Sequence, residues 1–117
     1  MQNKIQIATW NVNSIKVRFE QLITWLQQTS CDIVALQELK LDSVNNEKLV
    51  QKFADIGYQY VHNAQKTYNG VAILSKYPIT NVVYDIPNYN DEQKRVIVAT
   101  INGIRIICAY FVNGESI

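Results

Sequence analysis

The chain has 117 residues, of which 48% are hydrophobic and 18% are charged, and its formal net charge is +1 at pH 7. This length fits one domain, and the composition supplies a core and excludes a disordered chain. No apolar run approaches the roughly 18 residues of a membrane span, and the N-terminus leads into a strand pattern without the apolar region of a signal peptide. We therefore expect a cytoplasmic protein with no membrane partner. Because the net charge is near zero, attraction to nucleic acid would require a local basic patch.

The two cysteines, Cys31 and Cys108, are far apart in the sequence, and each lies inside an apolar segment. Buried free thiols in a reducing compartment are the favoured interpretation, with a disulfide left open. Neither cysteine has the CxxC or Cys/His spacing of a zinc site, so we expect no zinc.

The first half of the chain alternates predicted strands and helices. Residues 4–10 alternate apolar and polar side chains, which predicts a strand, and the polar residues 11–14 suit a turn and a helix N-cap. Apolar residues at helical spacing predict an amphipathic helix over residues 15–28. Lys16 and Arg18 lie in its first turns, where the helix dipole favours acidic residues. They are either simply solvated or placed to meet an anion.

Residues 32–38 (Asp-Ile-Val-Ala-Leu-Gln-Glu) form a short apolar run that predicts a buried strand. The run ends on Glu38, so a carboxylate lies at the tip of an element that excludes water. A charge there costs free energy unless it is paired or holds a cation, which makes Glu38 a candidate ligand for a hard ion such as Mg²⁺. The alternative is a strand-end glutamate that merely reaches solvent.

The second half of the chain is predicted to be mostly strands. A polar loop over residues 40–46 precedes a second helix over 47–55, with Gly57 as its C-cap. Asn102-Gly103 lies between two alternating runs, which is a strong hairpin signal. The predicted strands are residues 58–62, 71–74, 79–86, 95–101 and 104–110, with a polar loop at 88–93.

This order of elements predicts an α+β fold in which two helices cover one face of a mixed sheet. Several strands are apolar on both sides, so the second face must also be buried. The sequence offers no helix for that face and no obvious alternative. We therefore expect the chain to be half of a two-sheet domain.

Four segments together resemble successive motifs of the exonuclease III family, the bacterial DNA-repair nucleases within the endonuclease/exonuclease/phosphatase superfamily. They are residues 8–15 (ATWNVNSI), 32–38 (DIVALQE), 68–75 (YNGVAILS) and 109–116 (AYFVNGES). The resemblance covers essentially the whole chain. It implies that residues 1–117 are the N-terminal part of one four-layer αββα sandwich, whose C-terminal half is missing. The active site is then expected at the strand ends between the two halves.

The resemblance also implies roles for single residues. Glu38 is similar to the family's direct Mg²⁺ ligand, with Mn²⁺ as a substitute, and Asn11 to the catalytic asparagine that supports the metal and its bound groups. Asn13 lies where relatives offer another polar group. Tyr110 matches a tyrosine whose hydroxyl is near the scissile phosphate, and Arg95 falls where the family often has a basic residue.

Two departures from the family pattern affect these expectations. Ser14 replaces the usual glycine of an Asn-x-Asn-Gly motif, and the later Gly-Asp-x-Asn and Ser-Asp-His segments are absent from these residues. The sole histidine, His62, lies in a predicted strand and is not equated with the catalytic histidine. None of the matched residues is a good general base at neutral pH, so we expect the base from the missing half.

A basic, aromatic-bearing edge is the candidate DNA-binding surface. Its residues lie in loops or helix starts that follow strand ends, and they are Lys16, Arg18, Lys40, Lys66, Tyr68 and Asn69. Arg95 is included in the same set. Basic and aromatic groups of this kind suit contacts with the DNA backbone. The alternative is that the lysines are simply solvated at the surface. Trp10 and Trp25 are expected in the core.

The leading hypothesis is a Mg²⁺-dependent DNA-repair phosphodiesterase. Its partner would be double-stranded DNA with abasic sites or 3′ ends, on which the family acts as 3′-to-5′ exodeoxyribonuclease and abasic-site endonuclease. The isolated chain is expected to be inactive, and the missing half is a further expected partner. The alternatives are a phosphodiesterase or phosphatase acting on an inositol or lipid phosphate, and a non-catalytic truncated fragment.

Overall fold

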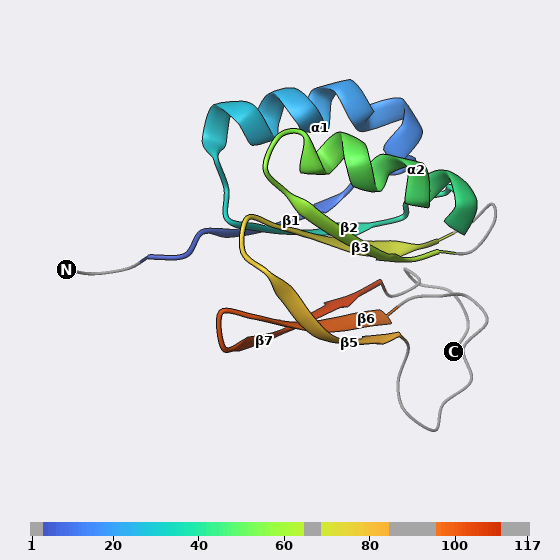
Figure 1. The fold of residues 1–117 in the computed structure, drawn as a ribbon. Helices are drawn as coiled ribbons and strands as arrows, with labels where there is room; N and C mark the ends of the chain where they lie inside the picture. Colours follow the sequence, from blue (N-terminus) through green and yellow to red (C-terminus); the bar gives the residue numbers. More distant parts are fainter. Residues whose placement is uncertain (1–3, 65–68, 85–95, 111–117) are drawn as a thin grey trace.

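The structure is a computed structural model that describes residues 4–64, 69–84 and 96–110. Two helices lie over a first sheet, and a second sheet lies on the opposite side of it (Figure 1). The elements in chain order are β1 (Ile7–Asn11), α1 (Ile15–Thr29), β2 (Ile33–Gln37), α2 (Ser43–Ala54), β3 (Gln59–Asn63), β4 (Val71–Ser75), β5 (Ile79–Tyr84), β6 (Val96–Ile101) and β7 (Ile104–Ala109). The predicted α+β class, with a mixed sheet and two helices on one face, is confirmed.

The first sheet has the strand order β1-β2-β4-β3. β1 runs parallel to β2, whereas β2 and β3 both pair with β4 in antiparallel register, so the sheet is mixed. The central strands β2 and β4 are covered on both faces. Val34 and Leu36 pack toward the helices, while Ile33 and Ala35 pack toward the second sheet. A continuous apolar run is the expected sequence pattern of a strand buried on both sides.

The helical layer packs through aromatic and leucine side chains. Leu22 and Leu26 of α1 are buried together with Phe53 of α2. The Phe53 ring lies 4.7 Å from the Tyr60 ring between centroids. Trp10 and Trp25, expected in the core, are partly buried against this cluster, with their rings in an edge-on contact at 6.3 Å between centroids.

The second sheet, in the order β5-β6-β7, covers the face of the first sheet for which the sequence offered no candidate. Ile97, Ala99 and Ile101 of β6 are buried against Ile33 and Ile73. The second face is buried, as expected, and the cover that the sequence did not identify comes from the chain's own later strands. Residues 76–78 end β4, and the strands that follow pair with one another in a separate sheet instead of extending the first.

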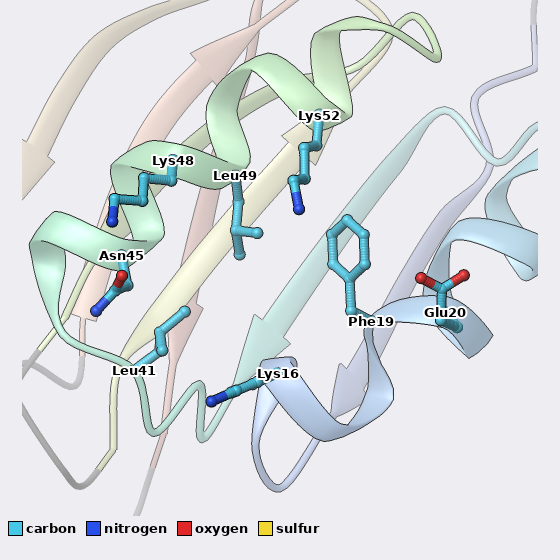
Figure 2. Close-up of a pocket in the computed structure, with 8 residues that line it drawn as sticks. All are labelled: Lys16, Phe19, Glu20, Leu41, Asn45, Lys48, Leu49 and Lys52. Atoms are coloured by element: carbon cyan, nitrogen blue, oxygen red, sulfur yellow. The ribbon is translucent and has the colours of Figure 1, made fainter.

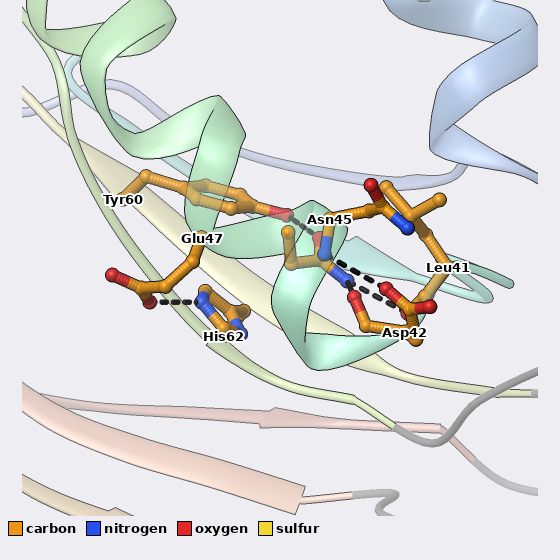
Figure 3. Close-up of polar contacts among 7 residues, drawn as sticks. Leu41, Asp42, Asn45, Glu47, Tyr60 and His62 are labelled. Atoms are coloured by element: carbon orange, nitrogen blue, oxygen red, sulfur yellow. Dashed lines mark hydrogen bonds and ion pairs between the residues drawn. The ribbon is translucent and has the colours of Figure 1, made fainter.

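The second helix begins at Ser43, whereas the sequence predicted residues 40–46 as loop and a start at residue 47. Asp42 is the N-cap, and its Oδ1 accepts a hydrogen bond from the Asn45 backbone at 2.7 Å (Figure 3). The buried Asn46 side chain donates to the carbonyls of Leu41 and Asp42 and accepts from the Tyr60 hydroxyl. The side chains of Asp42 and Asn46 thus satisfy backbone and side-chain partners in and around the first turn, so a stretch that resembled a loop is helical.

The C-cap of α2 is Asp55 and not Gly57, which lies two residues further on, and the remaining local predictions hold with shifted ends. Ser14 caps α1 by accepting from the Val17 backbone at 3.3 Å. Asn102 and Gly103 both have positive φ, 55° and 78°, as a two-residue hairpin turn requires. β1 begins three residues later than residue 4, where it was expected, and runs to Asn11. Both cysteines are free and buried. No helix within the described residues is long and apolar enough to cross a membrane.

Candidate active site at the strand ends

The strand topology brings Asn11 and Glu38 to one rim of the first sheet. β1 and β2 are parallel and Asn11 pairs with Gln37 in register, so the ends of both strands meet at the same edge. Asn11 Nδ2 donates a hydrogen bond to Glu38 Oε2 at 2.5 Å, and Asn11 Oδ1 accepts from the Asn13 backbone at 3.2 Å. The two side chains predicted to form one site are therefore in direct contact, with the amide orienting the carboxylate.

Lys40 is the second partner of this carboxylate. Its Nζ lies 3.7 Å from Glu38 Oε1 and donates to Asn13 Oδ1 at 2.6 Å. The Glu38 side chain is only 22% exposed. Lys40 was predicted to contact DNA, but its ion pair with Glu38 was not predicted. Glu38 and Lys40 both have left-handed backbone, with φ angles of 56° and 52°, which their residue types do not indicate.

Left-handed backbone conformations gather at this rim. Positive φ angles occur at non-glycine residues on three adjacent segments: Asn13 (46°), Ser14 (90°), Glu38 (56°), Lys40 (52°) and Asn69 (52°). Each such conformation costs of order 1–3 kcal/mol and persists only where the surroundings impose it. Strain of this kind concentrates at functional sites, which supports this rim as the candidate site.

Backbone hydrogen bonds hold the strained segments in place. The Ser14 N–H donates to the Glu38 carbonyl at 2.8 Å, which ties the start of α1 to the end of β2. The Lys40 N–H donates to the Asn69 carbonyl at 2.9 Å. Gly70 has a φ of 91°, and a Cβ there would lie 3.1 Å from the Leu39 Cβ, so this position requires glycine. The site is thus a rigid junction of three segments.

Gln37 and Cys108 connect this rim to the second sheet, a link that sequence reasoning missed. Gln37 Nε2 donates to Thr9 Oγ1 at 2.8 Å and contacts Cys108 Sγ at 3.6 Å. The Cys108 thiol donates to the Leu36 carbonyl at 3.4 Å, and burial raises the pKa of this thiol. The end of β7 therefore lies against the end of β2. Tyr110 follows one residue after β7 and packs against the core between the sheets.

The predicted DNA-binding residues divide into two groups and an untested remainder. Lys40 and Asn69 lie at the Glu38 rim. Lys16 is exposed and Arg18 half-buried, both in the first turns of α1. Lys66, Tyr68 and Arg95 lie outside the described residues.

His62 is separate from the candidate site, as expected. It lies on β3, and β4 separates that strand from β2. Its Nε2 lies 2.7 Å from Glu47 Oε2, and its ring contacts Tyr60 (Figure 3). This histidine belongs to the packing beneath α2.

The donor set fits a hard cation only in part. Within the described residues there is no cluster of three or more His, Cys, Asp or Glu side chains that could hold a metal. Mg²⁺ is usually bound through one or two carboxylates, with waters and substrate phosphates completing its coordination. Glu38 fits one such ligand. Asn11 and Lys40 fit groups that orient its carboxylate.

The fold and this rim define a class of αβ-layered protein with a carboxylate–amide site at the ends of parallel strands. The sequence pattern of the Endonuclease/Exonuclease/phosphatase family matches residues 8–113, and the chain belongs to this family.

Named relatives agree with this assignment. The chain is 30% identical to exodeoxyribonuclease III of Haemophilus influenzae over 118 aligned residues, which cover 96% of this chain and 43% of that protein. Its structure is similar to that of the 3′ phosphatase NExo from Neisseria bound to a product DNA hairpin, with a TM-score of 0.90 and 43% identity over 96% of this chain and 43% of that one. An AP endonuclease from Archaeoglobus fulgidus matches with a TM-score of 0.85 and 36% identity, over 92% of this chain and 41% of that one. The chain thus spans less than half the length of these relatives.

Proposed function

We propose that this chain supplies the Glu38–Asn11 part of the active site of a Mg²⁺-dependent DNA-repair phosphodiesterase. The observation that carries the proposal is the 2.5 Å contact between Asn11 and Glu38 at a strained strand-end rim. The named relatives support DNA as the substrate, because they include an exodeoxyribonuclease III, an AP endonuclease and a 3′ phosphatase bound to DNA. Double-stranded DNA with an abasic site or a 3′ end is the proposed substrate.

The chain's own residues would act by binding and orientation. Bound Mg²⁺ would supply Lewis-acid stabilisation of charge on the phosphoryl oxygens. Glu38 would hold it through its carboxylate, which the Asn11 amide orients without adding negative charge. Lys40 neutralises this carboxylate when no cation is bound and is placed to meet a phosphate oxygen when Glu38 engages a metal. Tyr110, after β7, is the proposed hydroxyl donor to the phosphate.

General-base chemistry is the part that these residues do not supply. Asn11, Lys40 and Tyr110 are poor bases at neutral pH, and Glu38 is committed to the cation. We therefore propose that the chain alone is inactive and that activity requires the region that its relatives have beyond the match.

A chimera tests the function directly. The chain replaces the matching segment of the Neisseria protein NExo, to which it is 43% identical. With Mg²⁺, the folded chimera is expected to act on labelled duplexes that carry an abasic-site analogue or a 3′ phosphate. Glu38→Gln is expected to lower the rate by at least about 100-fold, because charge stabilisation at the phosphate is worth several kcal/mol. Glu20→Gln, an exposed change on α1, is the matched control.

The alternatives give different results in the same assay. A folded chimera that hydrolyses a phosphoinositide but neither DNA substrate would contradict the DNA assignment. Equal rates for Glu38→Gln and the control would remove Glu38 from the site. Mg²⁺-dependent cleavage by the 117-residue chain alone, abolished by Glu38→Ala, would overturn the proposed inactivity and retain the nuclease assignment.

A further inference from the structure

A groove of about 390 Å³ lies between α1 and α2 on the outer side of the helical layer (Figure 2). Its volume is within the range of about 300–1,000 Å³ that is usual for ligand sites. The floor is apolar and the rim is basic. The floor consists of Phe19, Leu41 and Leu49, and the rim of Lys16, Lys48 and Lys52.

The rim carries positive charge that no described ion pair neutralises. The ion pairs within the described residues are Lys40–Glu38 and His62–Glu47, and neither involves a rim lysine. Lys52 lies over the Phe19 ring, with its Nζ 5.5 Å from the ring centroid, and Figure 2 shows its ammonium directed toward that ring. Glu20 is the single acidic side chain among the lining residues and lies beyond Phe19 at one end. The groove therefore has a surplus of cations.

The floor remains accessible although its residues are apolar. Phe19, Leu41 and Leu49 are partly buried, packed against the core from one side and facing the groove with the other. Covering them with an apolar side chain would remove apolar area from water, worth about 25 cal/mol per Å². A ligand that uses the whole groove must thus combine negative charge with an apolar anchor.

We propose that this groove binds an acidic peptide that inserts an aliphatic or aromatic side chain between α1 and α2. Carboxylates flanking the anchor would pair with Lys48 and Lys52, while the anchor would pack on Phe19 and Leu49. A nucleic-acid backbone matches the lysines but offers no apolar anchor for the floor. A membrane surface needs protruding apolar side chains, whereas these lie at the bottom of a concavity.

The test of this proposal is separate from that of the nuclease proposal, because its readout is peptide binding and the residues that it changes, Lys48 and Lys52, are not among the predicted DNA-binding residues. The probe is a fluorescein-labelled, aspartate-rich peptide that ends in Leu-Phe, and fluorescence anisotropy on the 117-residue chain gives the Kd. A matched peptide ends in Gly-Ser instead. We expect the Leu-Phe peptide to bind at least 10-fold more tightly than the Gly-Ser peptide.

Variants locate the binding on the chain. Lys48→Glu and Lys52→Glu, both exposed, are each expected to weaken binding of the Leu-Phe peptide at least 10-fold. Lys76→Glu, an exposed lysine just after β4, is the control with the same charge change and is expected to leave the Kd within 2-fold. Far-UV circular dichroism confirms that each variant keeps its fold.

Each other outcome overturns the proposal. Equal affinity for the two peptides would show attraction by charge alone. Equal losses in Lys48→Glu and Lys76→Glu would place the binding elsewhere. Tighter, Lys48-dependent binding to duplex DNA or to phosphatidylserine vesicles than to the Leu-Phe peptide would assign the groove to one of those partners.

Discussion

The two ends of β2 each carry an acidic residue, and the structure uses them in opposite ways. Asp32 precedes the strand, where its Oδ2 accepts from the Gln6 backbone at 2.8 Å and its Oδ1 from the Tyr77 hydroxyl at 3.3 Å. Glu38 follows the strand, and within the described residues its carboxylate contacts the side chains of Asn11 and Lys40. Its φ is 56°, whereas Asp32 has no positive φ.

The difference shows how to read a carboxylate at a strand end. Asp32 satisfies a backbone donor and thereby joins the chain before β1 to the start of β2, which is a structural role. Among the described residues, the Glu38 carboxylate accepts from side chains and from no backbone donor, and its own backbone is strained. Side chains can release a carboxylate to a cation more readily than a backbone donor can. Strain and side-chain partners together therefore distinguish a site from a structural contact.

The largest expected effect is at the glycine that supports the Glu38 end. Gly70→Ala places a Cβ 3.1 Å from the Leu39 Cβ at a φ of 91° and is expected to lower the free energy of unfolding by about 2–3 kcal/mol. Gly57→Ala is the matched control, because Gly57 has a φ of 90° but nothing within 4 Å of the added Cβ. Its expected loss is about 1 kcal/mol. Urea unfolding followed by tryptophan fluorescence measures both, and equal losses would contradict the close packing of Leu39 on Gly70.

The next effect is at the opposite end of the strand. Asp32→Ala leaves the Gln6 N–H and the Tyr77 hydroxyl without this acceptor, and we expect a loss of about 1–2 kcal/mol in the free energy of unfolding. Asp32→Asn retains an acceptor oxygen and should lose less. Urea midpoints at pH 7 measure the difference. A loss no larger than that of Asp55→Ala, an exposed change after α2, would argue against the structural role of Asp32.

At Glu38 itself the expected sign is reversed. Glu38→Gly relieves the left-handed backbone and is expected to raise the free energy of unfolding by up to about 1 kcal/mol while removing the proposed metal ligand. Glu20→Gly, on the exposed side of α1, should instead lower it by about 1 kcal/mol. Urea unfolding of the two variants decides the point. Equal destabilisation would show that the Glu38 end holds no relievable strain.

The smallest expected effect concerns the contribution of Tyr58 to stability, which changes with pH only in the alkaline range. The Tyr58 hydroxyl donates to the Cys31 carbonyl beside Asp32, and burial, then Cys31 and Asp32, raise its pKa from 10.0 to about 12. Between pH 10 and 12 the unfolded chain loses this proton while the folded chain keeps it, so stability must fall as pH rises.

Thermal midpoints from pH 8 to 12 measure this fall. Tyr58→Phe is expected to make it shallower, with a remainder from Tyr60, whose pKa is also raised by burial and by Glu47. Tyr84→Phe, at an exposed position, should leave the slope unchanged. A slope that is the same in Tyr58→Phe and the parent would contradict the raised pKa.

Sequence patterns predicted the elements whose period is unambiguous. Each of three patterns is compatible with one type of local structure: the buried apolar run of β2, the helical spacing of α1 and the Asn102-Gly103 turn. Because β1 and β2 are parallel, their ends lie at the same edge of the sheet, and this brings the side chains of Asn11 and Glu38 into contact. The start of α2 was missed because Asp42 and Asn46 are residues of loops and caps alike, and only their partners in the fold distinguish the two.

Long-range packing was the part that local patterns could not predict. The apolar runs of residues 79–110 predict strands, but they do not indicate whether these strands extend the first sheet or form a second sheet that covers it. The Lys40–Glu38 pair also depends on a left-handed turn at both residues, which their types disfavour. The groove between α1 and α2 requires the relative placement of two helices, for which no single-element pattern exists.

The position of β1 has a practical consequence for every measurement above. β1 pairs with β2, and no other described strand lies along its second edge, where Ile7 is 53% exposed. An open strand edge is a template onto which another chain can add, and self-association makes apparent stability depend on protein concentration. Unfolding midpoints and peptide affinities should therefore be compared at one fixed, low concentration, with a dilution series as the check.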